Sequence, residues 1–204
     1  MELKDILGLA VWILSIINGL MLLRYYLRDR AKLAVHPIHP DVYQWWFKLP
    51  SGEFEGNSTR KYGFLAYVGV VNSGLRKVSL VSWRLHLRTV GFRQVELKAV
   101  NIPEPKSELG DSGNVKCWQV LGQKGPLFSG STLIESGTSI SGMVCYVAEL
   151  WGSDIWNPQI KDGKITGKFV IKDAFGKKEQ CKITFSEVPL EKVTSMIEGI
   201  EKVV

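Results

Sequence analysis

The stretch HPIHPD holds the residue types that come closest to a metal site. His36 and His39 stand three positions apart and Asp41 follows, and imidazole and carboxylate groups are ligands that zinc accepts. The two prolines keep this backbone extended, however, and in an extended chain positions three apart face opposite sides. We therefore predict no metal site in this stretch and no cofactor for the protein.

Catalytic motifs are absent from the sequence. The chain has no P-loop, no dinucleotide-binding glycine pattern, no G-x-S-x-G and no H-E-x-x-H. We predict no catalytic residues and no enzymatic activity. A site assembled from distant residues needs no such motif, so a membrane-tethered enzyme with an unrecognised site is the alternative.

The three cysteines are an odd number and lie far apart. Cys117, Cys145 and Cys181 form no C-x-x-C pair, which fits reduced, buried thiols that act as small apolar side chains. A Cys145–Cys181 disulfide is the alternative, and it would require an oxidising compartment.

A set of basic side chains is a candidate interaction face. Arg84, His86 and Arg88 alternate with apolar residues, so they share the solvent side of one predicted strand. Such a face suits an acidic partner or an anionic membrane. Exposed charges without a partner are the competing interpretation.

Three tryptophans lie close to predicted loops and form a candidate aromatic surface. Trp118, Trp151 and Trp156 would expose large rings of the kind that dominate binding interfaces. Aromatic side chains that fill one end of a β-domain are the competing interpretation.

The N-terminal region predicts a transmembrane helix. Residues 6–23 carry no charge and would span about 27 Å as a helix. Tyr25 and Tyr26 extend the helix to residue 27 at the level of the lipid headgroups. The first five residues form a short tail without the basic character of a signal peptide, and no A-x-A-like site follows. We therefore favour an uncleaved anchor over residues 6–27.

Flanking charges predict the orientation of this helix. Only Lys4 precedes it, whereas Arg24, Arg28, Arg30 and Lys32 end it or follow it in the basic linker at 28–32. Because positive residues stay on the cytoplasmic side, we predict a single-pass cell-membrane protein with its N-terminus outside. Ser15 and Gly19 form a small-x-x-x-small pair within the span, which would allow a homodimer.

Residues 33–188 predict an antiparallel β-domain. Runs rich in Val, Ile, Phe, Tyr and Trp alternate with turn residues, and no helical period appears between them. We predict a mainly β fold, an immunoglobulin-like β-sandwich, with hairpins at 72–74 and 173–176 and a β-bulge near Leu80 and Val81. The predicted strands are 33–35, 42–49, 62–72, 77–89, 93–100, 116–121, 138–148, 164–172 and 178–186.

The last residues, 189–204, predict a short amphipathic α-helix. Pro189 suits a first helical turn, and five apolar residues then recur at helical spacing: Leu190, Val193, Met196, Ile197 and Ile200. We expect this helix to cover one edge of the sandwich. A helix that binds a partner is the alternative.

The segments YYLRDRAKLAV, VVNSGLRKVSL and IKDAFGKK resemble a broad group of small prokaryotic single-span membrane proteins. In that group an uncharged helix precedes Y-x-x-R-D-R-x-K-L-x-V and an immunoglobulin-like sandwich. Because the group is largely uncharacterised, the resemblance implies a topology and a fold but no activity. This chain differs from it in the loops at 101–115 and 122–131 and in the C-terminal helix.

Composition limits the classes of function. The 204 residues carry a net charge of +6, which permits a nucleic-acid or anionic-membrane partner without implying either; we do not favour nucleic acid. We expect a membrane-anchored β-sandwich that acts as a binding or scaffold module. Its partners would be the lipid bilayer and an unknown protein. An exported surface or periplasmic adhesion module is a further alternative.

Overall fold

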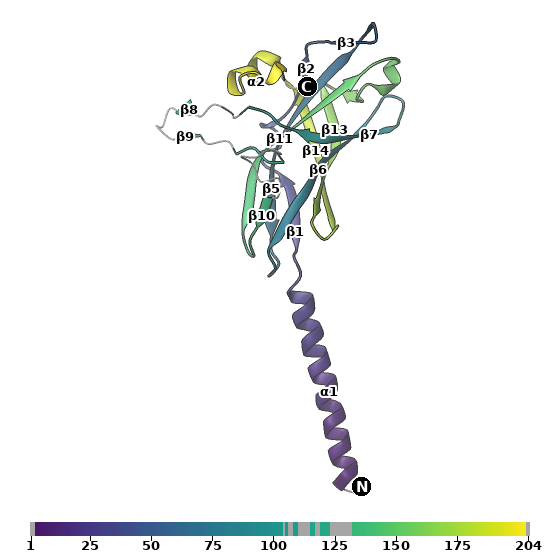
Figure 1. Cartoon of the computed structure of the whole chain (residues 1–204), viewed down its shortest axis with the longest axis vertical. Coiled ribbons are helices and arrows are strands. Elements are labelled where there is room, and N and C mark those ends of the chain that lie inside the picture. Colours follow the sequence, from purple (N-terminus) through teal and green to yellow (C-terminus); the bar gives the residue numbers. More distant parts are fainter. Residues whose placement is uncertain are drawn as a thin grey trace.

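A long N-terminal helix, α1 (Leu3–Arg28), projects from a β-domain (Figure 1). The structure is a computed structural model that describes residues 3–103, 105, 108–109, 115–116, 119–122 and 132–202. Within these residues one segment, Leu7–Leu27, is long and apolar enough to cross a membrane, and none of it is buried. An N-terminal signal sequence would meet the same criteria.

Eight strands make up most of the β-domain. They are β1 (Leu33–Pro37), β2 (Gln44–Leu49), β5 (Arg60–Asn72), β6 (Val78–Arg88), β7 (Gln94–Val100), β11 (Ser139–Leu150), β13 (Lys164–Asp173) and β14 (Lys178–Glu187). Shorter elements are β3 (Glu53–Phe54), β4 (Asn57–Ser58), β8 (Glu108–Leu109), β9 (Val115–Lys116), β10 (Thr132–Ile134), β12 (Ile160–Lys161) and the 3-10 helices η1 (Asp154–Trp156) and η2 (Ile200–Lys202). The predicted strand at 116–121 includes residues 117 and 118, which lie outside the described residues.

The main sheet closes on itself. Its strands follow the order β6-β7-β11-β5-β2-β14-β13, and β13 then pairs with β6 from Gly167↔Leu87 to Asp173↔Leu80. All of these pairings are antiparallel except β14 with β2. The mainly β prediction is therefore confirmed, but the seven strands form a barrel rather than the two separate layers of the predicted immunoglobulin-like sandwich. The difference arises because β6 is paired on both sides.

Alternation along the strands fills the barrel interior. On β6, Leu80, Leu85 and Leu87 are buried, and β13 adds Phe169 and Ile171. The predicted β-bulge is confirmed, because Lys172 pairs with Ser82 and Asp173 with Leu80, which leaves Val81 as the extra, exposed residue.

A buried glutamine joins two strands that share one edge of β5. β1 pairs with residues 68–72 of β5 and β2 with residues 61–66. Between them, the amide of Gln44 donates to the carbonyl of Tyr67 at 2.8 Å and accepts from its N–H at 3.2 Å. The side chain thus supplies the hydrogen bonds that a missing strand residue would make.

A second apolar layer covers the outside of β2, β5 and β11. The helix α2 (Leu190–Met196) and the residues after it bury Val193, Ile197 and Ile200 in this layer, together with Trp45 and Met143. The predicted apolar face is therefore confirmed, but it covers a sheet surface rather than an edge. The helix is shorter than predicted, because Ile197 is extended and Gly199 has a φ of +83°.

Both predicted hairpins are present, and both point toward α1 (Figure 1). In the β13–β14 turn, the carboxylate of Asp173 accepts hydrogen bonds from the N–H groups of Phe175 and Lys177 at 2.9 and 2.8 Å. In the β5–β6 turn, the buried side chain of Asn72 accepts from the N–H of Gly74 at 3.1 Å and donates to the carbonyl of Arg76 at 2.8 Å.

Candidate functional site

The barrel wall formed by β6, β13 and β14 carries a row of basic side chains. Register places His86 opposite Lys168, and Lys168 opposite Lys182. Residues next to them in sequence, such as Leu85, Phe169 and Ile183, are buried in the barrel. Because side chains alternate along a strand, the row must face outward.

This row lies in a groove of about 800 Å³, which we call the basic groove. Six of its lining residues are basic, and among the described residues that line it none is acidic. The basic residues are His86, Arg88, Lys161, Lys164, Lys168 and Lys182. The groove therefore concentrates positive charge on one side of the barrel.

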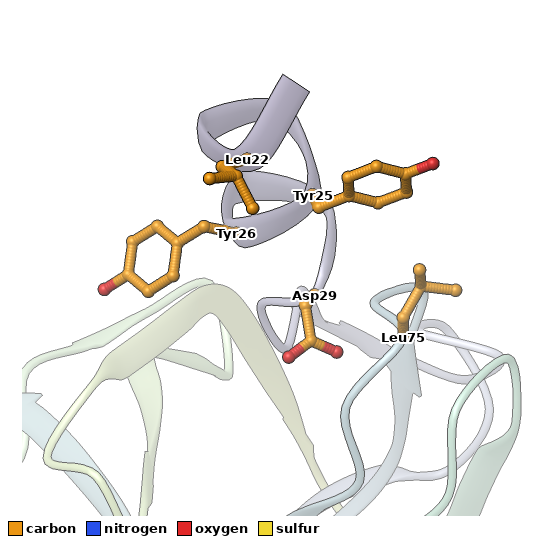
Figure 2. A pocket seen from close by; sticks show the side chains of 5 residues that line it. All are labelled: Leu22, Tyr25, Tyr26, Asp29 and Leu75. Atoms are coloured by element: carbon orange, nitrogen blue, oxygen red, sulfur yellow. The ribbon is translucent and has the colours of Figure 1, made fainter. Parts of the chain in front are cut away.

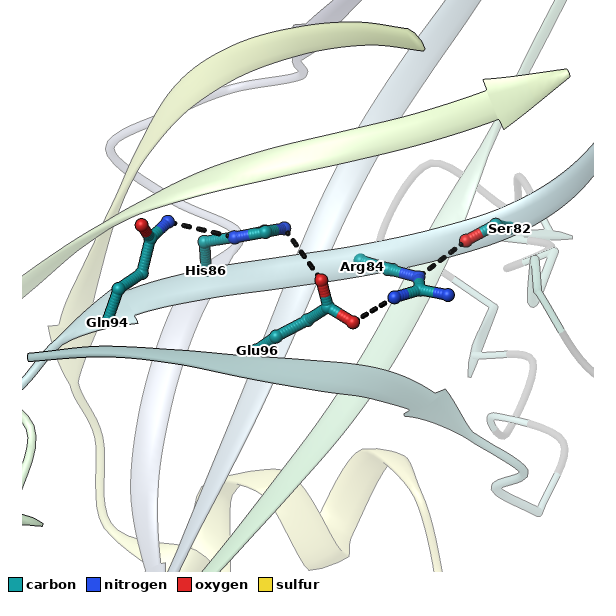
Figure 3. Close-up of polar contacts among 5 residues, drawn as sticks. All are labelled: Ser82, Arg84, His86, Gln94 and Glu96. Carbon is teal, nitrogen blue, oxygen red and sulfur yellow. Dashed lines mark hydrogen bonds and ion pairs between the residues drawn. The ribbon is translucent and has the colours of Figure 1, made fainter. Parts of the chain in front are cut away.

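Only one of these six residues has an acidic partner within the described part of the chain. His86 lies 3.4 Å from a carboxylate oxygen of Glu96. Figure 3 shows that the other oxygen of Glu96 contacts Arg84, whose Nε donates to the hydroxyl of Ser82 at 3.0 Å. Arg84, His86 and Arg88 therefore share the outer face as alternation predicts. Glu96 engages the first two, and both His86 and Arg88 line the groove.

The register of Lys168 with Lys182 places two positive side chains opposite each other. Like charges directly opposite each other on neighbouring strands repel, typically by a fraction of 1 kcal/mol. Sequence reasoning missed both lysines as site residues. The alternation in KITGK and CKITF indicates that they face outward, but only strand register brings them together with His86.

The cysteine nearest to this row is not an activated nucleophile. Cys181 lines the groove and is a free thiol, and partial burial raises its pKa to about 11. Cys145, which lies in the outer apolar layer, is fully buried and also free, and burial raises its pKa to about 12. Both thiols stay protonated at neutral pH, and nucleophilic attack requires the thiolate. Cys117 lies outside the described residues.

The predicted tryptophan surface is described only in part. Trp118 lies outside the described residues. Trp151 is exposed just after β11, and Trp156 lies in η1, where its ring centre is 4.8 Å from the guanidinium carbon of Arg93. No described ring contact joins Trp151 to Trp156, so the surface stays a prediction.

The predicted membrane-flanking residues lie at the end of α1 and just after it. Arg24 is exposed, Arg28 ends the helix, and the guanidinium carbon of Arg30 lies 4.7 Å from the centre of the Tyr26 ring. Lys32 is exposed directly before β1.

The predicted dimer contact lies on α1. The hydroxyl of Ser15 donates to the carbonyl of Val11 at 2.9 Å, and no other side chain occupies the space beside Gly19. Dimerisation through this pair stays a prediction.

Comparison with known proteins finds similar solved structures but no family. No protein-family model matches the chain, and no curated protein matches it. The chain is similar to the crystal structure of the putative ApaA protein from Bordetella pertussis, with 12% identity, coverage of 78% of this chain and 96% of that chain, and a TM-score of 0.32. It is also similar to the X-ray structure of a Northeast Structural Genomics Consortium target, with 8% identity, coverage of 78% and 89%, and a TM-score of 0.32.

Proposed function

We propose that this chain is a membrane-anchored binding module whose basic groove holds an acidic segment of a partner protein. The observation that carries this proposal is the row of His86, Lys168 and Lys182 in a groove whose described lining contains no acidic residue. Basic side chains gathered on one side of a barrel, with no acidic residue among the described lining, complement an acidic ligand.

The chemistry of the groove favours binding over catalysis. Its lysines supply positive charge on flexible stems, which complements carboxylates. The thiol of Cys181 is protonated at neutral pH because its pKa is raised. The described lining thus offers charge complementarity, and its one thiol is not activated.

An acidic polypeptide fits the groove better than a nucleic acid does. Sites for single-stranded nucleic acid interleave basic residues with several stacking aromatic rings. Phe92 is the one Phe, Tyr or Trp among the described lining residues. The volume of about 800 Å³ is within the range of sites that hold small ligands or short segments.

We also propose that α1 anchors the protein in the cell membrane, with its N-terminus outside and the barrel in the cytoplasm. The support is the charge asymmetry between Lys4 on one side and Arg24, Arg28, Arg30 and Lys32 on the other. A fluorescent reporter that matures only in the cytoplasm, fused after residue 204, should be bright. Alkaline phosphatase activity from the same fusion would instead mean that the barrel is exported.

The groove can be tested with a defined acidic probe. We would measure binding of a fluorescent octaglutamate peptide to the full chain in detergent micelles by anisotropy. Binding should weaken with salt, because exposed charges are screened, and it should be lost when Lys168→Glu and Lys182→Glu are combined.

The same two strands supply a matched control. Lys172 and Lys178 are also exposed and directly opposed on β13 and β14, but neither lines the groove. Combining Lys172→Glu with Lys178→Glu makes the same change in net charge, so this variant should retain the peptide. Equal loss in both double variants would mean that net charge, rather than the groove, holds the peptide.

A further inference from the structure

We propose that the end of the barrel nearest α1 docks on the membrane, with Leu75 and Phe175 inserted among the lipids. This inference rests on the proposed membrane anchor and concerns a surface separate from the basic groove. The partner is a lipid bilayer that contains anionic headgroups. Three observations carry it: a braced connection, two apolar hairpin tips and a surrounding set of basic residues.

The connection between α1 and the barrel is braced by the β5–β6 turn. The helix ends at Arg28 and β1 begins at Leu33. Within the short linker, the carboxylate of Asp29 lies 2.9 Å from Arg76, and the carbonyl of Lys32 accepts from the N–H of Ser73 at 2.9 Å. These contacts hold the hairpin against the end of the helix, so the barrel cannot move freely away from the membrane.

Gly74 makes this close approach possible. A Cβ atom at this position would overlap the carbonyl oxygen of Arg30, and the backbone N of Lys32 would lie only 2.5 Å away. Both of these neighbours are backbone atoms, which cannot rotate out of the way. The linker and the turn therefore pack against each other with no space for a side chain.

Two apolar side chains stand at the tips of the hairpins beside the helix. Leu75 is 51% exposed and lines a hollow with Leu22, Tyr25 and Tyr26 (Figure 2). Phe175 is 71% exposed and lines a second hollow with Tyr26 and Leu27.

The depth of these tips follows from the tyrosines beside them. Tyrosines at the end of a membrane span settle at the level of the headgroups. Figure 2 shows Tyr25 and Tyr26 directed to different sides of the helix, with Leu75 on the turn below Tyr25. Leu75 and Phe175 line hollows with these tyrosines, so both tips lie beside the headgroup level.

Basic residues surround the two tips. Arg30, Lys32, Arg76, Lys77 and Lys177 are exposed at this end of the barrel. Of the described acidic groups at this end, Asp29 pairs with Arg76, Glu179 pairs with Lys177, and the carboxylate of Asp173 is buried in its turn. Glu135 is exposed beside the β5–β6 turn, so the basic residues still outnumber the acidic ones. Apolar tips within a basic surround match the interface of an anionic bilayer, where apolar groups insert and cations contact headgroups.

Photocrosslinking in a bilayer tests this contact. We would replace Leu75, Phe175 or Phe92 by p-benzoylphenylalanine in the full chain, reconstitute it in nanodiscs containing phosphatidylglycerol, and irradiate. Phe92 is the control, because it is 80% exposed but lies in the turn after β6, at the opposite end of that strand from Leu75. Lipid adducts, seen as added mass on the intact protein, should form at residues 75 and 175 several times more than at residue 92.

The experiment has two readouts, one for the membrane anchor and one for docking of the barrel end. Co-elution of the protein with the discs tests the anchor, whereas the adduct yield tests the docked end. Adduct yields at residues 75 and 175 no higher than at residue 92 would overturn the docking proposal while the anchor stands. Crosslinks between protein chains in place of lipid adducts would mean that a second copy covers this end, which also overturns it. A chain that does not co-elute with the discs overturns both proposals.

Discussion

We predict that removing one charge from the row of His86, Lys168 and Lys182 stabilises the barrel. Lys168 is the central residue, because it lies directly opposite both His86 and Lys182. Lys168→Gln removes the charge while keeping most of the stem. If repulsion within the row is real, the variant should unfold at a higher temperature than the natural protein, although it loses affinity for acidic peptides.

The magnitude follows from the geometry of the sheet. Directly opposite residues have Cβ atoms about 5 Å apart, and flexible stems let the ammonium groups of Lys168 and Lys182 separate further. Two unit charges about 8 Å apart in water repel by about 0.5 kcal/mol. For a protein of this size such a gain raises the midpoint of thermal unfolding by about 1–2 °C.

The assay is thermal unfolding of the full chain in detergent micelles, followed by near-ultraviolet circular dichroism at low and high salt. The gain should be present at low salt and vanish near 1 M, where the screening length falls to about 3 Å. Lys48→Gln is the control, because Lys48 is exposed and faces Tyr62 across the sheet rather than another cation. A midpoint for Lys168→Gln equal to or below that of the control at low salt would refute the reasoning.

Three further predictions concern stability. Gly74→Ala should lower the free energy of unfolding by about 1–3 kcal/mol, measured by thermal unfolding, because its Cβ would overlap the linker backbone. Ile197→Ala should lower it by about 2–5 kcal/mol, because this side chain is fully buried in the outer layer. Burial raises the pKa of the Cys145 thiol to about 12. Between about pH 8.5 and 12 only the unfolded protein's thiol ionises. The contribution of Cys145 to the free energy of unfolding should therefore be constant below about pH 8.5 and be lost as pH rises toward 12. Unfolding of Cys145→Ala between pH 8 and 11 should accordingly show a shallower decline than the natural protein does.

Local patterns predicted much of the fold because they reflect local physics. The parity change in β6 predicted a bulge near Leu80 and Val81, and the apolar spacing at the end of the chain predicted that Val193, Ile197 and Ile200 are buried. Turn residues likewise identified both hairpins. In each case a few neighbouring residues contain the whole signal.

Closure of the barrel could not be predicted in this way. A sandwich and a barrel share the same alternation along each strand, and they differ only in whether the outer strands pair. That choice depends on the pairing of β6 with β13, which are far apart in the sequence. The hydrogen bonds of Gln44 could not be predicted either, because a glutamine in an apolar strand does not indicate that its side chain bonds the backbone of Tyr67.

The candidate site could not be predicted from the sequence, because it too depends on how strands pair. Outward positions of Lys168 and Lys182 follow from alternation, but their meeting with His86 follows from register between three strands. Alternation predicted the basic trio of Arg84, His86 and Arg88, but in the structure Glu96 pairs with the first two. A single strand therefore indicates which side chains face solvent, whereas the sheet decides which charges remain free.

The positions of the two basic surfaces explain how one barrel can use both. Val78 begins β6 at the end nearest α1, and His86 lies eight residues further along, which is about 26 Å at the usual rise of a strand. Screening at physiological salt acts over about 8 Å, so anionic headgroups that contact the hairpin tips exert little force on the groove. Docking on lipid would then fix the orientation of the barrel while leaving the basic groove available. The lysines of the groove would bind protein partners selectively rather than contact the membrane.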